Sequence, residues 1–224
     1  MILPSESDRG AVLVGSAFIE RHLRSFFDAI VPSALGKKKR ESLLDNTSGP
    51  LGTFSARVEV AYATRLISRA LYDALHVFRR IRNEVAHHPK SFNLRKQAAR
   101  VRQMYLLGPD VPVAVNRMAL EVMTYIKVGN ALDSVKHPEE DRPYFNTSQE
   151  VMEFISEDPE IIEILDEQLP RYELAVGIVL ICALLTSHRE AALRIVGPDG
   201  SLNMLDRDSE HQGQADVREE SQGV

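Results

Sequence analysis

Near the start of the chain, mostly apolar residues recur at the spacing expected of one face of a helix. In residues 8 to 31 its members follow one another at intervals of four and three, at Val12, Ser16, Ile19, Leu23, Phe26 and Ile30. This spacing places side chains on one helical face. Ser7 or Asp8 can accept hydrogen bonds from the first free N–H groups, and Pro32 stops the helix. The pattern therefore predicts an amphipathic helix over residues 8 to 31.

The pattern then changes to a connector and a short helix. Residues 33 to 52 contain "GKKKRES" and "NTSGPLG", both rich in residues that form turns. We expect a connector over these residues. A second helix is predicted from Thr53 or Ser55, either of which can serve as its N-cap, to about Tyr62.

A third helix is predicted from about Ser68 to Ala86. Its apolar face consists of Leu71, Leu75, Phe78, Ile81 and Val85. Pro89 ends this helix, because the residue before a proline is pushed out of helical geometry.

More helices are expected in the second half of the chain. We expect a shorter basic helix over residues 93 to 106. A long helix is expected around Pro112, since proline is tolerated in the first turn. "KHPEEDRPYFNTS", residues 136 to 148, has two prolines and no apolar period, which predicts a loop. Ser148 can cap the short acidic helix "QEVMEFISE", and Pro159 can start the next one.

The last helix sets the expected architecture. Residues 171 to 195 are apolar nearly all round, which predicts a helix in the middle of a bundle. No alternating strand pattern and no internal repeat are present. We therefore predict an all-α bundle of about six to eight helices in a single domain, residues 1 to 196. Residues 197 to 224 have little to bury and predict a disordered tail.

Charge is distributed unevenly around a net value of −5. The basic block, residues 65 to 102, has ten Lys or Arg against two acids, and the acidic block, residues 139 to 173, has twelve acids against two bases. Such blocks can face different partners, or each other in a homodimer. RNA or DNA is the expected partner of the basic block, and a protein that of the acidic block.

Several chemistries are not indicated by the sequence. Cys182 is the only cysteine, and the seven histidines show no His-x3-His spacing, so we expect no disulfide within the chain, no metal and no cofactor. The longest apolar run, Leu174 to Leu185, is shorter than the roughly 20 residues that span a bilayer. The N-terminus lacks the layout of a secretory signal. We expect a soluble cytoplasmic protein without a membrane contact.

The stretch "RRIRNEVAHH", residues 79 to 88, holds the candidate site. Arg82 can bind a phosphate through two N–H groups, His87 can move the proton of a ribose 2′-OH, and Asn83 can orient either. Arg79 and Arg80 are candidate nucleic-acid contacts. On an intact helix, however, Arg82 and His87 lie about 140° apart, and only fraying at Ala86 would bring them together. The alternative is that His87 caps the helix while the polar residues are solvated.

The quoted residues resemble a known family. "DRGAVLVGSAFIERHL" and "LLDNTSGPLGTFSARVEVAYATRLISRALYDALHVFRRIRNEVAHH" resemble the mannitol operon repressor (MltR) family over roughly residues 8 to 90. The shared features are Glu20-x-x-Leu23, the Gly-Pro-Leu-Gly turn, Ser55-x-Arg57, and a helix closing with Arg-x4-His. The resemblance implies an all-helical transcriptional regulator that acts through protein partners, because no helix-turn-helix is recognisable.

"RNEVAH" also resembles the Arg-x4-His motif of the HEPN superfamily, helical dimers that include ribonucleases. That resemblance implies the alternative function, a metal-independent endoribonuclease in which Arg82 holds the scissile phosphate and His87 handles the proton. A regulatory, non-enzymatic protein is the leading hypothesis. Burial of Arg82 against an acid such as Glu20 would favour it, since buried charges are normally paired.

Overall fold

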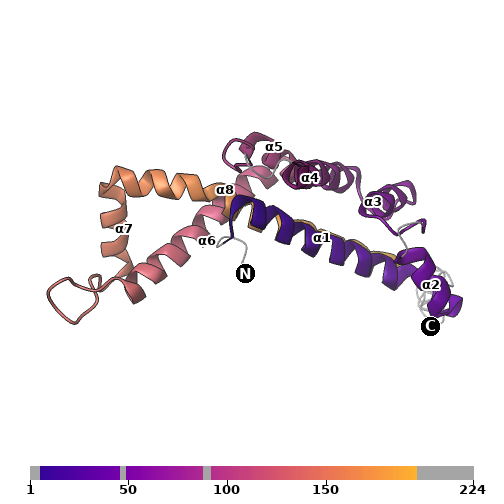
Figure 1. Ribbon diagram of the computed structural model, residues 1–224, viewed down its shortest axis with the longest axis horizontal. Coiled ribbons are helices and arrows are strands. Elements are labelled where there is room, and N and C mark those ends of the chain that lie inside the picture. The colour runs from indigo at the N-terminus through magenta and orange to yellow at the C-terminus, as the bar shows by residue number, and fades with distance from the viewer. Residues whose placement is uncertain (1–5, 46–48, 88–91, 196–224) are drawn as a thin grey trace, which may run out of the picture.

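The protein is built from helices that form a body and a protruding arm (Figure 1). The computed structural model describes residues 6–45, 49–87 and 92–195. Within these ranges there are eight α-helices: α1 (Asp8–Ile30), α2 (Lys37–Leu44), α3 (Phe54–Ala63), α4 (Arg69–His87), α5 (Ala98–Arg102), α6 (Val111–Ser134), α7 (Ser148–Glu157) and α8 (Pro159–Ile195). Apart from one isolated bridge between Lys136 and Pro143, these ranges contain no β-structure. The predicted all-α class is confirmed; the expected tail, residues 197–224, lies outside the described residues.

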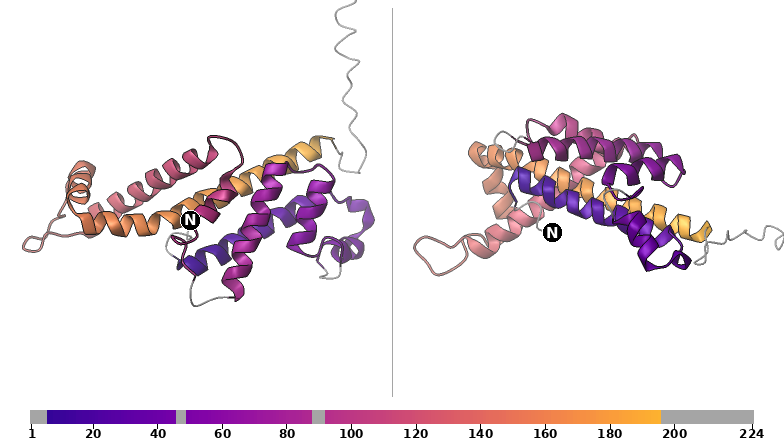
Figure 2. Two further views of the ribbon diagram at one scale, coloured as in Figure 1. Left: turned by 90° about the horizontal axis from the view of Figure 1, so that it is seen from above. Right: turned by 45° about the vertical axis from the view of Figure 1, so that its right-hand side comes forward.

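The body consists of α1, α3, α4, α5 and the second half of α8. Figure 2 shows α1 running beside α8, which is the most extensive helix pair in the protein, with α3 and α4 packed over α1. The arm consists of α6, α7, the loop between them and the first half of α8, which together form an open triangle (Figure 1). Helix α8 therefore belongs to both parts and connects them.

The predicted apolar stripes form the core of the body. The α1 stripe from Val12 to Phe26 and the whole predicted face of α4 are buried, and Ile30 packs partly buried against them. Two glycines let helices approach closely. A Cβ atom added at Gly15 would overlap the side chain of Ile178, and one added at Gly177 would overlap the ring of Tyr105. The body is thus packed too tightly at these points for a larger residue.

The connector prediction was wrong for the lysine-rich segment, which forms α2. Gly36 precedes this helix with φ of 75°, a conformation that favours glycine. Arg40 donates hydrogen bonds to the carbonyls of Asp28 and Val31, and Leu44 is fully buried. These tertiary contacts, rather than an apolar period, stabilise α2 against the end of α1.

Two other boundaries differ from the predictions. The helix starting at Pro159 and the one expected over residues 171 to 195 are a single helix, because α8 continues through Pro170. Pro170 is buried, and Leu169 and Tyr172 on either side pack against α6, so packing offsets the hydrogen bond that proline cannot donate. The N-cap of α7 is Thr147 rather than Ser148, since its hydroxyl accepts the N–H of Glu150 at 3.2 Å. The predicted helix over residues 93 to 106 is helical only from Ala98 to Tyr105.

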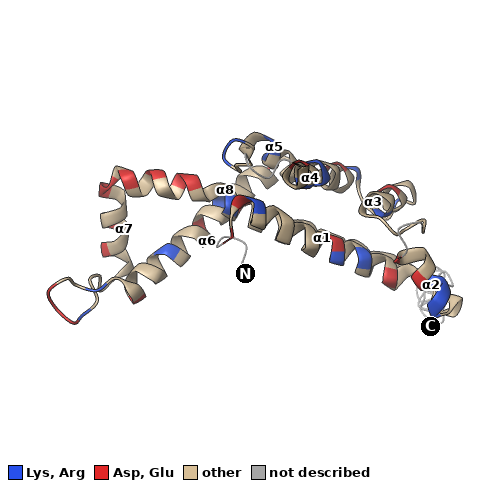
Figure 3. Ribbon diagram, viewed as in Figure 1, with Lys and Arg blue, Asp and Glu red and all other residues tan. Residues whose placement is uncertain are grey.

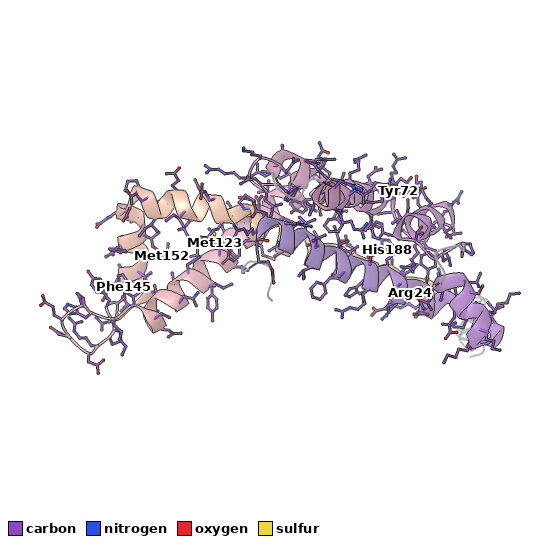
Figure 4. The ribbon with its side chains drawn as sticks, in the orientation of Figure 1. Arg24, Tyr72, Met123, Phe145, Met152 and His188 are labelled. Atoms are coloured by element: carbon purple, nitrogen blue, oxygen red, sulfur yellow. The ribbon has the colours of Figure 1, made fainter. Side chains whose placement is uncertain are left out.

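The arm has only small apolar clusters of its own. Met123 packs with Ala119 and Tyr172, and Phe145 packs with Val128 and Val151 (Figure 4 labels Met123 and Phe145). Many large apolar side chains of the arm remain exposed, among them Tyr125, Phe154 and Ile164. The arm therefore presents an unusual amount of apolar surface for a solvent-facing element.

The two charged blocks touch within one chain. Figure 3 marks Lys and Arg positions on α4 and α5 and Asp and Glu positions along the arm half of α8. Arg95 pairs with Glu167 at 3.5 Å, and Arg102 pairs with the buried Glu173 at 3.4 Å. Asn116 also donates to Glu173 at 2.6 Å. Part of each block is thus neutralised where the arm joins the body.

Among the described residues, α8 alone is long and apolar enough to cross a membrane by length and composition. Half of its most apolar stretch is buried within the protein. The core helix of a globular protein passes the same test, so these properties alone do not make α8 a membrane span.

Candidate functional site

A polar pocket of about 470 Å³ lies between α1, the start of α3 and α4, and it collects part of the predicted site. Arg79, Arg82 and Asn83 line it, while Arg80 and His87 are not among its lining residues. Residues at positions i, i+3 and i+4 of a helix share one face, which explains why these three side chains of α4 converge. Arg80 is rotated by about 100° from Arg79 and points elsewhere.

Helix α3 begins at the pocket. The hydroxyl of its N-cap, Thr53, accepts the N–H of Ala56 at 3.1 Å. The N–H groups of Phe54 and Ser55 belong to the first turn and have no acceptor within the helix. Gly52, the last residue of the Gly-Pro-Leu-Gly turn, also lines the pocket. The residues at the positive end of the α3 helix dipole therefore belong to the lining of the pocket.

Arg57 lines the pocket and is buried. Its Nε donates to the carbonyl of Leu51 at 2.7 Å, and its Nη2 donates to the carbonyls of Leu44 at 2.8 Å and Gly52 at 3.5 Å. Burial, and secondarily the nearby charge of Arg24, lowers the pKa of Arg57. An arginine remains a cation at neutral pH all the same. Arg57 thus fixes the turn before α3 and leaves a positive charge beneath the pocket.

Arg82 lies at the rim, facing Glu20 of α1. The guanidinium is 3.9 Å from the Glu20 carboxylate and 3.4 Å from the side-chain oxygen of Asn83. Both partners are well exposed, Arg82 at 44% and Glu20 at 39% of the side chain. Arg82 therefore lies near Glu20, as a non-catalytic role would favour, but the two side chains are not buried. An exposed pair at this distance contributes little stability, so Arg82 is available to other anions.

Arg79 lies deeper in the pocket. Its Nε is buried and has no hydrogen-bond partner, and among the described residues Arg79 has no ion pair. A buried donor without an acceptor is costly and rare in folded proteins. A lining arginine of the pocket therefore has one buried donor without a partner among the described residues.

His87 is the last residue of α4 and is exposed. Because α4 continues through His87 instead of fraying at Ala86, five helical positions separate it from Arg82, a rotation of about 140°. Within one chain, the structure therefore does not bring the imidazole into the pocket of Arg82. The catalytic assignment of Arg82, Asn83 and His87 stays a prediction.

Sequence reasoning missed part of this pocket. Ser16 was assigned only to the apolar stripe of α1, and the turn ending at Gly52 was interpreted as structural. The signal that could have found them is the resemblance itself. The segments that carry it, containing Glu20, the Gly-Pro-Leu-Gly turn, Ser55-x-Arg57 and the end of α4, converge on this pocket.

Other candidate chemistry is not supported by the surroundings of the residues. Cys182 is buried in α8, and burial raises the pKa of its thiol to about 11, so it is not a nucleophile at neutral pH. The described part of the chain contains no group of three or more His, Cys, Asp or Glu side chains that could hold a metal ion.

The second candidate surface is an apolar groove of about 590 Å³ between α6 and α8. Its lining includes Met118, Val122, Ile126 and Val179, all exposed, and contains no charged residue. An exposed apolar groove of this kind is typical of a surface that binds another protein.

Comparison with models of known protein families, with curated proteins and with solved structures finds no match to this chain. The resemblances to the MltR family and to the HEPN motif therefore rest on the quoted segments alone.

Proposed function

We propose that this chain is a non-catalytic regulatory protein that acts through contacts with other proteins, beginning with a second copy of itself. The observation that carries the proposal is the apolar groove between α6 and α8 (the α6–α8 groove). The MltR-like segments supply the regulatory role, and that part of the proposal rests on resemblance.

The α6–α8 groove suits a homodimer interface. Its lining is apolar, it lies on a pair of helices, and the exposed residues Met118 and Val179 come from different helices on its two sides. A twofold dimer uses the same patch on both copies, and an uncharged patch can face its own copy without repulsion. Covering it would remove from water the large side chains that the single chain leaves exposed.

The pocket around Arg82 supports the non-catalytic part of the proposal. General acid–base catalysis needs the proton-moving group within hydrogen-bond reach of the reacting atoms. His87 is not among the residues that line this pocket. The metal-independent ribonuclease remains the alternative function, with Arg79 and Arg80 as its RNA contacts.

The charged blocks offer surfaces for further partners. Acidic side chains of the arm, such as Glu160 and Glu163, have no ion pair among the described residues and face solvent. A basic protein segment would be attracted to this face. RNA or DNA is the corresponding partner of the basic block, through residues such as Arg80.

Dimer formation is expected to depend on the α6–α8 groove. Replacing Val179 with lysine places a charge in the apolar interface, which we expect to shift the protein from dimer to monomer, with at least a tenfold rise in the dissociation constant. The measurement is size-exclusion chromatography with light scattering over a range of concentrations.

The matched control is Val113→Lys. Val113 is on α6 and is 72% exposed, but it does not line the groove, so this variant should remain dimeric. Circular dichroism verifies that both variants are folded. A wild-type protein that stays monomeric at every concentration contradicts the proposed interface, as does equal dissociation of the two variants.

A further inference from the structure

We propose that the polar pocket between α1, α3 and α4 (the arginine pocket) binds the phosphate group of a small molecule. This inference goes beyond the proposed function and does not depend on it. It rests on three features of the pocket: its surplus of guanidinium groups, an unpaired buried donor on one of its lining arginines, and the presence of the first turn of α3 in its lining.

The charge of the lining favours an anion. Three guanidinium groups, those of Arg57, Arg79 and Arg82, line the cavity, and Glu20 is the only carboxylate among the lining residues. Glu20 is 3.9 Å from Arg82 and also stabilises the charge of Arg57, but one carboxylate leaves a net positive charge on a lining with three guanidinium groups. Arginines gathered in a concave site attract and hold phosphate more strongly than the same charges on an open surface.

The unpaired donor belongs to a residue that lines the cavity. Arg79 lines the pocket, its Nε is buried, and that nitrogen has no hydrogen-bond partner among the described residues. Leaving such a donor unpaired costs free energy. A phosphate bound beside Arg79 would give this guanidinium group an acceptor once the side chain turns toward it, and would remove the cost. This is the strongest local indication of a missing acceptor.

Neutral donors complete the site. The hydroxyl groups of Ser16 and Ser55 and the amide of Asn83 line the same cavity. Phe54 and Ser55 of the first turn of α3 also line it, and helix N-termini stabilise anions through their free N–H groups and the dipole. A phosphate has several acceptor oxygens, so it can use donors from more than one wall at once. A planar carboxylate can use fewer.

The size of the pocket indicates a small ligand. Its volume of about 470 Å³ exceeds that of a phosphate ion and lies in the range of small-molecule sites. Phe54 and Phe78 also line it and would contact the carbon part of a phosphate monoester. A polynucleotide instead needs a basic groove that follows its backbone, whereas here Glu20 stands at the rim and Arg80 lies outside.

Isothermal titration calorimetry on the full chain tests the site, with inorganic phosphate, glycerol 2-phosphate and a short single-stranded RNA at constant ionic strength. Arg79→Gln and Arg82→Gln are expected to weaken binding of the phosphate probes by roughly tenfold or more each. Glu20→Gln is expected to strengthen it, because the competing carboxylate is removed. The matched control is Arg80→Gln, which removes the same charge from α4 outside the pocket and should leave binding unchanged.

The two phosphate probes distinguish the source of the ligand. Tighter binding of glycerol 2-phosphate assigns the site to a phosphorylated small molecule, and equal binding assigns it to the free ion; both support a phosphate site. The inference is overturned if neither probe binds saturably, if Arg80→Gln weakens binding as much as Arg79→Gln, or if RNA binds more tightly than both probes. If Arg79→Gln fails to fold, the opposite shifts in Arg82→Gln and Glu20→Gln, both at exposed positions, decide the question.

Discussion

Replacing Gly177 with alanine is expected to lower the free energy of unfolding by about 1–3 kcal/mol. Alanine normally stabilises a helix relative to glycine by about 0.5–1 kcal/mol. At Gly177 the added methyl group would overlap the buried ring of Tyr105, which lies beneath α8 where the arm joins the body. Because the ring is almost fully buried, moving it would disturb the packing around it, and we expect this cost to outweigh the gain in helix propensity. Urea denaturation followed by circular dichroism measures the change.

Gly129→Ala is the matched control for this prediction. Gly129 is also a helical glycine, in α6, but an added Cβ atom there would meet no atom within 4 Å. We expect this variant to be stabilised by about 0.5–1 kcal/mol. Changes of the same sign in the two variants would contradict the close contact between α8 and Tyr105.

Replacing Arg57 with methionine is expected to lower the free energy of unfolding by about 2–4 kcal/mol. The change removes the donors to the carbonyls of Leu44, Leu51 and Gly52. Methionine retains much of the buried aliphatic volume, so the decrease in the free energy of unfolding measures the contribution of the hydrogen bonds. Because these bonds hold the turn before α3, the first turn of that helix should also lose protection. Thermal unfolding and amide hydrogen exchange measure the two effects.

Arg80→Met is the control, since Arg80 is exposed and outside the pocket, and it should change stability by less than about 0.5 kcal/mol. Arg57→Lys should restore only part of the loss, because an ammonium group cannot reproduce the fork of a guanidinium. Wild-type stability in Arg57→Met would contradict a structural role for these hydrogen bonds.

The parts of the fold that sequence predicted are those with a strong apolar period. Helices α1 and α4 bury the predicted faces because their stripes leave no other arrangement that removes them from water. Helix α2 has no such period, and it exists because Arg40 bonds to the end of α1. The continuity of α8 through Pro170 likewise depends on packing against α6. Local patterns do not contain these tertiary contacts.

The candidate site was predictable to a similar extent. Arg79, Arg82 and Asn83 share a helical face, so their convergence follows from spacing alone. The contribution of Ser16 and of the turn ending at Gly52 could not be found this way, because it depends on how α1 and α3 pack against α4. The position of His87 depended on whether α4 frays, and the helix continues through that residue.

The most direct test of the account is RNA cleavage by the purified protein in EDTA. It is run beside Arg82→Ala and His87→Ala proteins whose folding is verified by circular dichroism. Because α4 turns His87 away from the arginine pocket, we expect no cleavage and no 2′,3′-cyclic phosphate ends from any of the three proteins. Chelator-resistant cleavage by the wild type that is lost in both variants would contradict the account and identify residues 79 to 88 as a ribonuclease active site.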